Sequence, residues 1–284
     1  MICTLCPRMC GADRALISGR CGVTNTLRVA RAAPHMWEEP CISGEKGSGA
    51  VFFSGCPLGC AYCQNRKISR GQAGRPMAVE ELAGTFRRLE AEGVHNLNLV
   101  TPTHYQPQII EALRTARPKI PVVWNTGGYE LAHRIKELEG LVKVWLPDFK
   151  YMDAGLAGRY SAAPDYPDFA KSALAEMVRQ QPEPVFDGDG MMTGGVMVRH
   201  LVLPGHTDDS KRIIRYLYET YGDKIYLSIM NQFTPNVGCP ELSRPVTEEE
   251  YDGVVDYALS LGVTGAFIQE GDTVSESFIP EFED

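Results

Sequence analysis

The stretch Ala50–Asn65, AVFFSGCPLGCAYCQN, decides the fold because it joins a buried strand to a loop of cysteines. The apolar, β-branched and aromatic run Ala50–Phe53 predicts a buried strand, and Gly55 ends it. Three cysteines follow at C-x3-C-x2-C spacing, namely Cys56, Cys60 and Cys63. They are expected on a loop at the carboxyl end of a strand, which is the reactive end in α/β barrels.

The cysteine triplet predicts an iron–sulfur site with one open metal position. Three thiolates can hold three irons of a cubane [4Fe–4S] cluster, whereas ordinary four-cysteine sites close the fourth iron as well. An open coordination position distinguishes a reactive metal site from a structural one, because substrate can then bind the metal directly. A lone C-x2-C pair also occurs in zinc knuckles and redox pairs, so zinc ligands and uncoordinated thiols are the alternatives. The setting of the triplet after a strand favours the cluster.

Length and charge narrow the classes of function. The chain has 284 residues, enough for one large domain or for one domain with a small appendage. Its 28 basic and 36 acidic residues give a net charge of -8. Nucleic acid is therefore a disfavoured partner, because phosphate binding depends on basic surface.

The sequence predicts a cytoplasmic protein that does not enter a membrane. Met1 is followed directly by Ile2 and Cys3, without the basic region and apolar run of a secretory signal. We find no apolar run of membrane-spanning length. The nine cysteines are therefore expected to be metal ligands or catalytic thiols in a reducing compartment, and not disulfides.

Apolar runs alternate with amphipathic stretches along the rest of the chain. This pattern predicts strands at 50–53, 96–100, 121–124, 141–146, 196–203, 225–230 and 265–268. It predicts helices at 78–92, 106–117, 129–138, 169–181, 211–221 and 247–261, with a polar connection at 153–167. Strands separated by single helices call for parallel crossovers, so we expect an α/β fold, a partial (β/α)6 TIM-like barrel. The barrel is assigned to residues 49–284, after a cysteine-rich extension at 1–48.

A second group of cysteines lies in the amino-terminal extension. Its members are Cys3, Cys6, Cys10 and Cys21, at C-x2-C-x3-C-x10-C spacing. Pro7 and Gly11 favour tight turns around a metal. Four thiolates close a site fully, so that it stabilises the fold or relays electrons without binding substrate. Zinc and an auxiliary iron–sulfur cluster are both compatible with this spacing, and uncoordinated thiols are the alternative. Cys41 and Cys239 belong to neither motif.

The triplet, with the aromatic Tyr62 directly before its last cysteine, resembles the signature of the radical S-adenosylmethionine (SAM) superfamily. Longer stretches resemble a branch of the pyruvate formate-lyase activating enzyme homologues. These are CTLCPRMCG at 3–11, WEEPCISG at 37–44, CQN at 63–65 and MNQFTP at 230–235. The resemblance implies that the methionyl amine and carboxylate of SAM chelate the open iron. An electron from the cluster then splits the sulfonium to give a 5'-deoxyadenosyl radical.

The resemblance also implies cofactor contacts near the cluster loop and at the ends of the strands. The candidates are Tyr62, Thr101, Thr103, Asn125, Thr126, Asp148, Lys150, Arg199, Asn231 and Gln232. In the family a Gly-Gly-Glu type motif after the second strand receives the methionyl amine. Here Thr101-Pro102-Thr103 stands in its place and offers two hydroxyl acceptors, unless Pro102 merely ends the strand. Asn125 and Thr126 open a turn similar to the family's Thr-Asn-Gly turn, although a tight turn that needs glycine also fits.

Three of the candidate cofactor contacts are charged. Two of them follow the fourth predicted strand, and one lies within the fifth. Period-two alternation puts Asp148 and Lys150 on one side, where the ammonium of Lys150 is placed to meet the methionyl carboxylate. A surface ion pair is the alternative. Arg199 lies in an apolar run, and a buried guanidinium needs an anionic partner. Bound cofactor and Asp148 are both candidates for that partner.

The expected activity is that of a radical enzyme that abstracts hydrogen, with a glycine of a partner protein as the candidate substrate. The expected electron source is a reductant such as flavodoxin or ferredoxin. Radical modification of a small molecule, peptide or RNA is one alternative. A non-catalytic iron–sulfur electron-transfer protein is the other.

Overall fold

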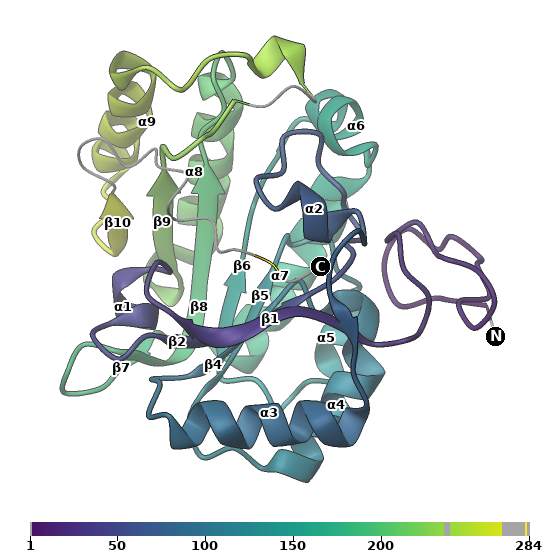
Figure 1. Ribbon diagram of the computed structural model, residues 1–284. Coiled ribbons are helices and arrows are strands. Elements are labelled where there is room, and N and C mark those ends of the chain that lie inside the picture. Colours follow the sequence, from purple (N-terminus) through teal and green to yellow (C-terminus); the bar gives the residue numbers. More distant parts are fainter. Residues whose placement is uncertain (1, 236–238, 269–281, 283–284) are drawn as a thin grey trace.

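The computed structural model describes residues 2–235, 239–268 and 282 (Figure 1). Its sheet contains parallel strands that follow one another in chain order. They are β2 (Ser48–Phe53), β4 (Leu97–Val100), β5 (Val122–Thr126), β6 (Val144–Pro147), β8 (Met192–Leu201), β9 (Tyr226–Met230) and β10 (Ala266–Ile268). Consecutive parallel neighbours are the arrangement of a barrel wall. Within the described ranges β10 does not pair back to the first strands, so the structure is a partial TIM-like barrel.

Helices connect these strands along the outer side of the sheet (Figure 1). They are α3 (Val79–Ala91), α4 (Gln106–Ala116), α5 (Ala132–Lys136), α6 (Ala154–Ser161), α7 (Tyr166–Gln180), α8 (Thr207–Tyr221) and α9 (Glu248–Leu261). The α3 helix packs beside α4, and α8 packs beside α9. The short elements are α1 (Pro40–Ser43), α2 (Arg66–Ser69), β3 (Arg75–Pro76), β7 (Val185–Phe186), η1 (Thr103–Tyr105), η2 (Gly222–Lys224) and η3 (Pro240–Leu242).

Alternation along each parallel strand separates an outer core from an inner one. In β5, Trp124 joins the large cluster under the helices, whereas its neighbour Val123 joins a smaller cluster inside the barrel. In β6, Trp145 faces the helices and Leu146 faces the interior. Both faces of the strands are thus covered, as parallel sheets require. The same alternation turns Asp148, two positions beyond Leu146, toward the interior.

The inner cluster is completed by α1. Cys41 and Ile42 of this helix are buried against Val123, Leu146 and Met197 of the strands. The α1 helix follows the strand β1 (Arg28–His35), which pairs with β2 in the sheet (Figure 1). Burial of these apolar side chains holds α1 in place as a plug. The residues just before it, Glu38 and Glu39, are carried into the barrel.

The structure moves the boundary of the amino-terminal extension. The sequence analysis assigned residues 1–48 to the extension, but β1 pairs antiparallel with β2, with Ala33 opposite Ala50. Residues 28–48 are therefore part of the barrel wall and its plug. The strand was missed because its residues, RVARAAPH, include two arginines and a proline and do not alternate in polarity.

One predicted connection is a helix. Residues 153–167 were expected to be irregular, but α6 occupies Ala154–Ser161. Its N-cap is Asp153, whose side chain accepts a hydrogen bond from the backbone N–H of Leu156. Two glycines and a following proline hid this helix, whereas the cap supplies its start. None of the helices in the described part of the chain is long and apolar enough to span a membrane.

Candidate active site

The cysteine loop follows β2 at the carboxyl end of the sheet. Its first turn needs glycine, because Gly55 has φ +88° and a Cβ there would lie 2.7 Å from the carbonyl oxygen of Cys21. That carbonyl accepts a hydrogen bond of 3.0 Å from the backbone N–H of Cys56. The side chain of Arg8 donates to the carbonyls of Pro57 and Leu58 at 2.8 and 2.9 Å. The amino-terminal segment therefore holds the loop from outside.

The loop opens into a cavity of about 260 Å³ that brings together most of the predicted site residues. Those lining it are Cys56, Cys60, Tyr62, Cys63, Thr101, Asn125, Thr126, Asp148, Lys150, Arg199 and Gln232. They come from six parallel strands and the loops that follow them, as expected for a barrel. Thr103 and Asn231 do not line the cavity.

The charged side chains of this cavity form one connected network. Lys150 Nζ lies 2.6 Å from Asp148 Oδ2, and Arg199 Nε lies 3.0 Å from Asp148 Oδ1. Burial alone would lower the pKa of Lys150, but the carboxylate of Asp148 raises it. Burial raises and the two cations lower the pKa of Asp148, and the net change is downward. Asp148 is therefore ionised and shared by two cations.

A second carboxylate completes the network, and sequence reasoning missed it. Glu38 Oε2 lies 3.0 Å from Arg199 Nη1, while Glu38 Oε1 accepts hydrogen bonds of 3.1 Å from Asn98 and Asn125. Arg199 Nη2 donates to Asn125 Oδ1 at 2.7 Å. Two cations and two carboxylates thus face the cavity, and their formal charges cancel. The signal in the sequence was the acidic pair within WEEPCISG, directly before a buried helix.

Glu39, the neighbour of Glu38, is also buried. It accepts a hydrogen bond of 2.9 Å from Ser228 Oγ of β9. Burial raises the pKa of its carboxyl group. The plug therefore inserts two acidic side chains into the barrel, one paired with Arg199 and one bound to a serine.

The predicted threonines have a different partner from the one expected. Thr103 Oγ1 and Thr126 Oγ1 each donate to Glu130 Oε1 at 2.6 Å, and Trp124 Nε1 approaches the same oxygen at 3.4 Å. Glu130 is fully buried, and burial raises its pKa to about 7. Its Oε2 has no hydrogen-bond partner among the described residues. The hydroxyl of Thr103 is thus hydrogen-bonded to Glu130. Thr101, whose φ is +57°, lines the cavity.

The segment after β9 contributes Gln232 to the cavity. Gln64 of the cysteine loop donates through Nε2 to the carbonyl of Gln232 at 2.7 Å and to Thr234 Oγ1 at 3.2 Å. The loop after β9 is thereby tied to the cysteine loop. Tyr62, by contrast, is buried and points toward Tyr151, whose hydroxyl is 2.9 Å away.

Residues 50–153 match the model of the Radical SAM superfamily. The chain carries a radical SAM domain. The match begins in β2, includes the whole cysteine loop and ends shortly after Lys150. The match thus covers four of the parallel strands, together with Asp148 and Lys150 of the charged network.

Known proteins resemble the chain over a wider range. An uncharacterized protein of Methanocaldococcus jannaschii is 26% identical over 269 residues, which cover 90% of this chain and 74% of the relative. The crystal structure of Streptococcus suis SuiB bound to the precursor peptide SuiA has a TM-score of 0.52 at 12% identity, covering 76% of this chain. Methylornithine synthase (PylB) has a TM-score of 0.49 at 14% identity, covering 75% of this chain and 60% of that chain. The chain matches 47% of the SuiB chain, and this likeness supports the fold alone.

The radical SAM domain implies a [4Fe–4S] cluster and SAM, and the three loop cysteines suit the cluster chemically. Burial raises the pKa of Cys56 to about 12 and raises that of Cys63 as well. A coordinated metal reverses this effect, because it stabilises the thiolate. Among the described residues, no three His, Cys, Asp or Glu side chains are arranged closely enough to hold a metal ion. The fit therefore rests on the shared cavity and on the donor chemistry.

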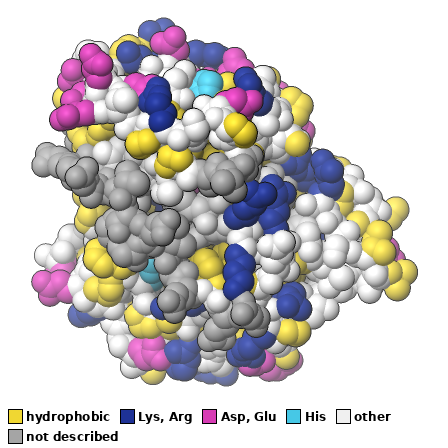
Figure 2. Space-filling model, turned by 45° about the horizontal axis from the view of Figure 1, so that its top comes forward, with side chains coloured by type: hydrophobic (Ala, Val, Ile, Leu, Met, Phe, Trp, Pro, Cys, Tyr) yellow, Lys and Arg dark blue, Asp and Glu magenta, His cyan; other side chains and the backbone are white. Residues whose placement is uncertain are grey.

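Two of the amino-terminal cysteines, Cys10 and Cys21, lie beside Gly19. A Cβ atom at Gly19 would lie 3.4 Å from Cys21 Sγ and 3.5 Å from Cys10 Sγ. Burial and the nearby thiols of Cys21 and Cys3 raise the pKa of Cys6 to about 12. Cys41 and Cys239 are buried elsewhere. Figure 2 shows hydrophobic side chains on the lobe at the right, where the amino-terminal segment lies.

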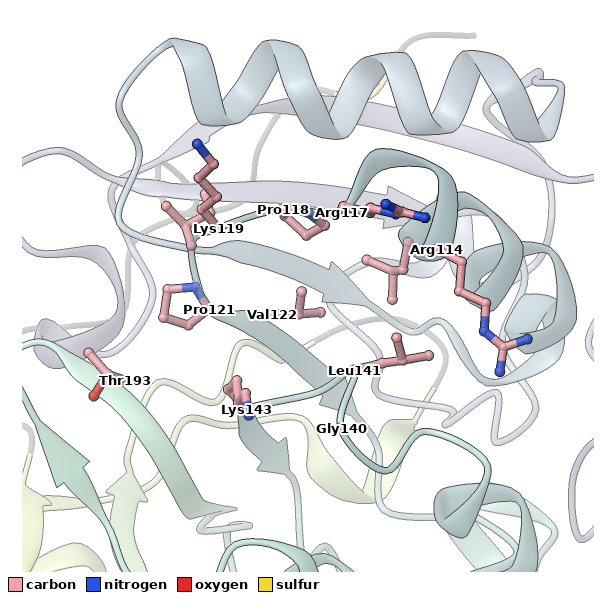
Figure 3. A pocket seen from close by; sticks show the side chains of 12 residues that line it. Arg114, Arg117, Pro118, Lys119, Pro121, Val122, Gly140, Leu141, Lys143 and Thr193 are labelled. Carbon is pink, nitrogen blue, oxygen red and sulfur yellow. The ribbon is translucent and has the colours of Figure 1, made fainter.

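A larger cavity, of about 690 Å³, lies at the other end of the strands (Figure 3). Exposed basic side chains surround it, namely Arg114, Arg117, Lys119 and Lys143. Arg114 lies near the carboxyl end of α4 and Arg117 is its C-cap, where cations complement the helix dipole. The amino ends of barrel strands ordinarily serve stability. The smaller cavity is therefore the candidate active site.

Proposed function

We propose that this protein is a radical enzyme in which Cys56, Cys60 and Cys63 hold a [4Fe–4S] cluster with one open iron. When bound there, the cluster and SAM supply a 5'-deoxyadenosyl radical for hydrogen abstraction. The observation that carries the proposal is the single cavity that joins the three cysteines to the balanced network around Arg199. Placement of the cluster loop at the carboxyl end of the strands supports it.

The charged network suits the amino-acid part of SAM. The methionyl group carries one carboxylate and one amine, and the cavity offers both cations and carboxylates. Lys150 and Arg199 are the proposed partners of the carboxylate. The amine binds iron only in its neutral form, and Asp148 and Glu38 are the proposed acceptors for its N–H groups. Thr101 and Gln232 remain proposed contacts at the rim.

The amino-terminal cysteines are proposed to bind zinc or an auxiliary iron–sulfur cluster. The C-x2-C-x3-C-x10-C spacing offers four thiolates, and two of these cysteines, Cys10 and Cys21, lie beside Gly19. Free thiols of this number suit the reducing cytoplasm, where we place the protein. A flavodoxin or ferredoxin is the proposed electron donor.

The proposed substrate is a glycine of a partner protein, as the resemblance to activating enzymes implies. The test is anaerobic incubation of the reconstituted, reduced enzyme with SAM and with candidate partner proteins from its own genome neighbourhood. Release of 5'-deoxyadenosine and methionine is the result expected of the radical SAM chemistry. A lasting glycyl doublet in the electron paramagnetic resonance spectrum of the partner is expected of the activase function. SAM cleavage without such a doublet would instead support modification of a small molecule, peptide or RNA.

A matched control variant shows whether loss of SAM cleavage is specific to the three loop cysteines. Replacing Cys56, Cys60 and Cys63 by alanine removes the proposed ligands and is expected to abolish SAM cleavage. Replacing Cys41 and Cys239 by alanine removes two buried cysteines outside both motifs and is expected to leave cleavage in place. Equal activity of the two variants would contradict the assignment of the cluster.

A further inference from the structure

A buried chain of hydroxyl groups ends on a cysteine of the cluster loop. Ser161 Oγ lies 3.1 Å from Cys60 Sγ. Tyr151 OH lies 2.8 Å from Ser161 Oγ, and Tyr62 OH lies 2.9 Å from Tyr151 OH. All four residues are buried. The proposed function uses none of these hydroxyls.

The backbone around the chain fixes Ser161 beside the cysteine. Ser161 is the last residue of α6, and the preceding carbonyl, of Tyr160, accepts a 2.8 Å hydrogen bond from the N–H of Ala61. Arg8 Nη2 donates to the carbonyl of Ser161 at 2.6 Å and to that of Leu58 at 2.9 Å. The end of α6 and the cluster loop are thus bound to each other on both sides of Cys60. A hydroxyl held this firmly is preorganised as a donor to the sulfur.

Proton counting gives the bond between Ser161 and Cys60 a direction. Each hydroxyl has one proton, and a metal-bound thiolate has none, so Cys60 Sγ can only accept. Ser161 must then donate to the sulfur. The Tyr151 hydroxyl contacts Ser161 Oγ and donates to Tyr62 OH.

We propose that Ser161 tunes the reduction potential of the cluster by donating a hydrogen bond to Cys60. Hydrogen bonds to ligand sulfurs are among the factors that set the potentials of iron–sulfur sites. A donor stabilises the reduced state, which has gained one negative charge, and so raises the potential. The inference rests on the proposed function in one respect, namely that Cys60 is a cluster ligand.

The test is a redox titration of the reconstituted protein, with dithionite as reductant and the paramagnetic signal of the reduced cluster as readout. Ser161→Ala is expected to shift the midpoint potential to a more negative value at unchanged iron and sulfide content. Ser161→Thr keeps the hydroxyl and is expected to restore the native potential. Ser48→Ala is the matched control, because Ser48 is a buried serine at the opposite end of β2 that bonds to Asn96.

Tyr151→Phe supplies a second, milder variant, since it keeps the hydroxyl of Ser161 and removes the hydroxyl that contacts it. A smaller shift in the same direction is expected. A native midpoint potential in a fully loaded Ser161→Ala protein overturns the inference. The titration does not depend on SAM cleavage, so its failure differs from failure of the proposed function, which would show as loss of 5'-deoxyadenosine release in the native protein.

Discussion

At the scale of single residues, Arg199 shows how a buried charge is matched. Its guanidinium bonds to Asp148, to Glu38 and to Asn125, on three different elements. The sequence placed Arg199 in an apolar strand and left its partner open between bound cofactor and Asp148. The structure provides two protein carboxylates, so the fold itself neutralises this cation. Any bound carboxylate group must therefore share Arg199 with them.

Glu38→Ala is expected to lower the free energy of unfolding by about 3 kcal/mol, because it breaks a buried ion pair and leaves Arg199 with one carboxylate. The side chain of Glu38 is only 9% exposed. The control is Glu81→Ala, which removes the exposed pair with Arg75 and is expected to cost less than about 1 kcal/mol. Chemical denaturation of both variants checks the prediction. Equal losses would show that the network does not bear on stability.

Glu130 is expected to make stability fall as the pH rises. Its pKa of about 7 in the fold exceeds the ordinary value of 4.5, so the folded state holds a proton that the unfolded state releases. The stabilisation is complete below pH 4.5 and is lost as the pH rises through 7. At about 1.4 kcal/mol for each pKa unit, the loss amounts to roughly 3 kcal/mol.

Urea unfolding at pH 5 and at pH 7.5 measures this effect. Glu130→Gln keeps an oxygen acceptor for Thr103 and Thr126 and removes the titration, so its stability is expected to change less between the two pH values. Glu219→Gln, on the exposed face of α8, is the control and is expected to behave as the native protein does. An unaltered pH dependence in Glu130→Gln contradicts the prediction.

At the scale of elements, the strands that could be predicted are those with a strong local pattern. The apolar runs of β2, β4, β5, β6, β8 and β9 were found because both faces of a parallel strand are buried, and α3, α8 and α9 were found from their helical periodicity. β1 was missed because its place in the sheet comes from pairing with β2 and not from its own residues. α6 was missed because glycine and proline outweighed its N-cap.

The residues of the candidate site also divide into those that a local sequence pattern predicts and those that only the fold brings together. Asp148 and Lys150 were predicted to lie on one side, because alternation is a local rule, and both line the cavity. There they form an ion pair with each other, which was the alternative interpretation. Glu38 and Glu130 were missed because their partners lie on other elements and only the fold unites them. Thr103 shows the converse, since its hydroxyl has the expected position along the chain but is bound to Glu130.

The start of α9 offers a prediction at this scale. Thr247 accepts from the N–H of Glu250, and the Glu250 side chain accepts from the N–H of Thr247, which is a capping box. Thr247→Ala is expected to lower stability by about 1 kcal/mol, because the cap is lost. Thr85→Ala within α3 removes only a bond to the carbonyl of Glu81 and is expected to change stability little. Thermal or urea unfolding compares the two, and a larger effect at Thr85 would contradict the role of the cap.

At the scale of the whole molecule, the amino-terminal segment and the barrel are joined behind the cluster loop. Arg8 donates to the carbonyls of Pro57, Leu58, Ser161 and Ala162. Arg14 reaches the carbonyl of His104 at 2.6 Å. These bonds cross long separations in sequence. Integrity of the segment is therefore expected to affect retention of the cluster.

Arg8→Ala is expected to speed the loss of iron to a chelator severalfold, because the cluster loop loses bonds to two of its carbonyls. Arg8→Lys is expected to restore little, since one ammonium cannot reproduce the planar fork of a guanidinium. Arg114→Ala, at the far end of the strands, is the control. Iron release followed by absorbance measures the rates. Identical rates in native protein and Arg8→Ala would show that the segment does not secure the loop.

The central claim is that one iron of the cluster is left open for SAM. Electron–nuclear double resonance of the reduced protein with SAM carrying a 15N-labelled amine tests it most directly. A hyperfine coupling between the cluster and the label is the predicted result, and it is expected to vanish in Glu38→Ala if Glu38 helps to hold the amine. No coupling in a sample that contains a complete cluster and bound SAM would contradict the account.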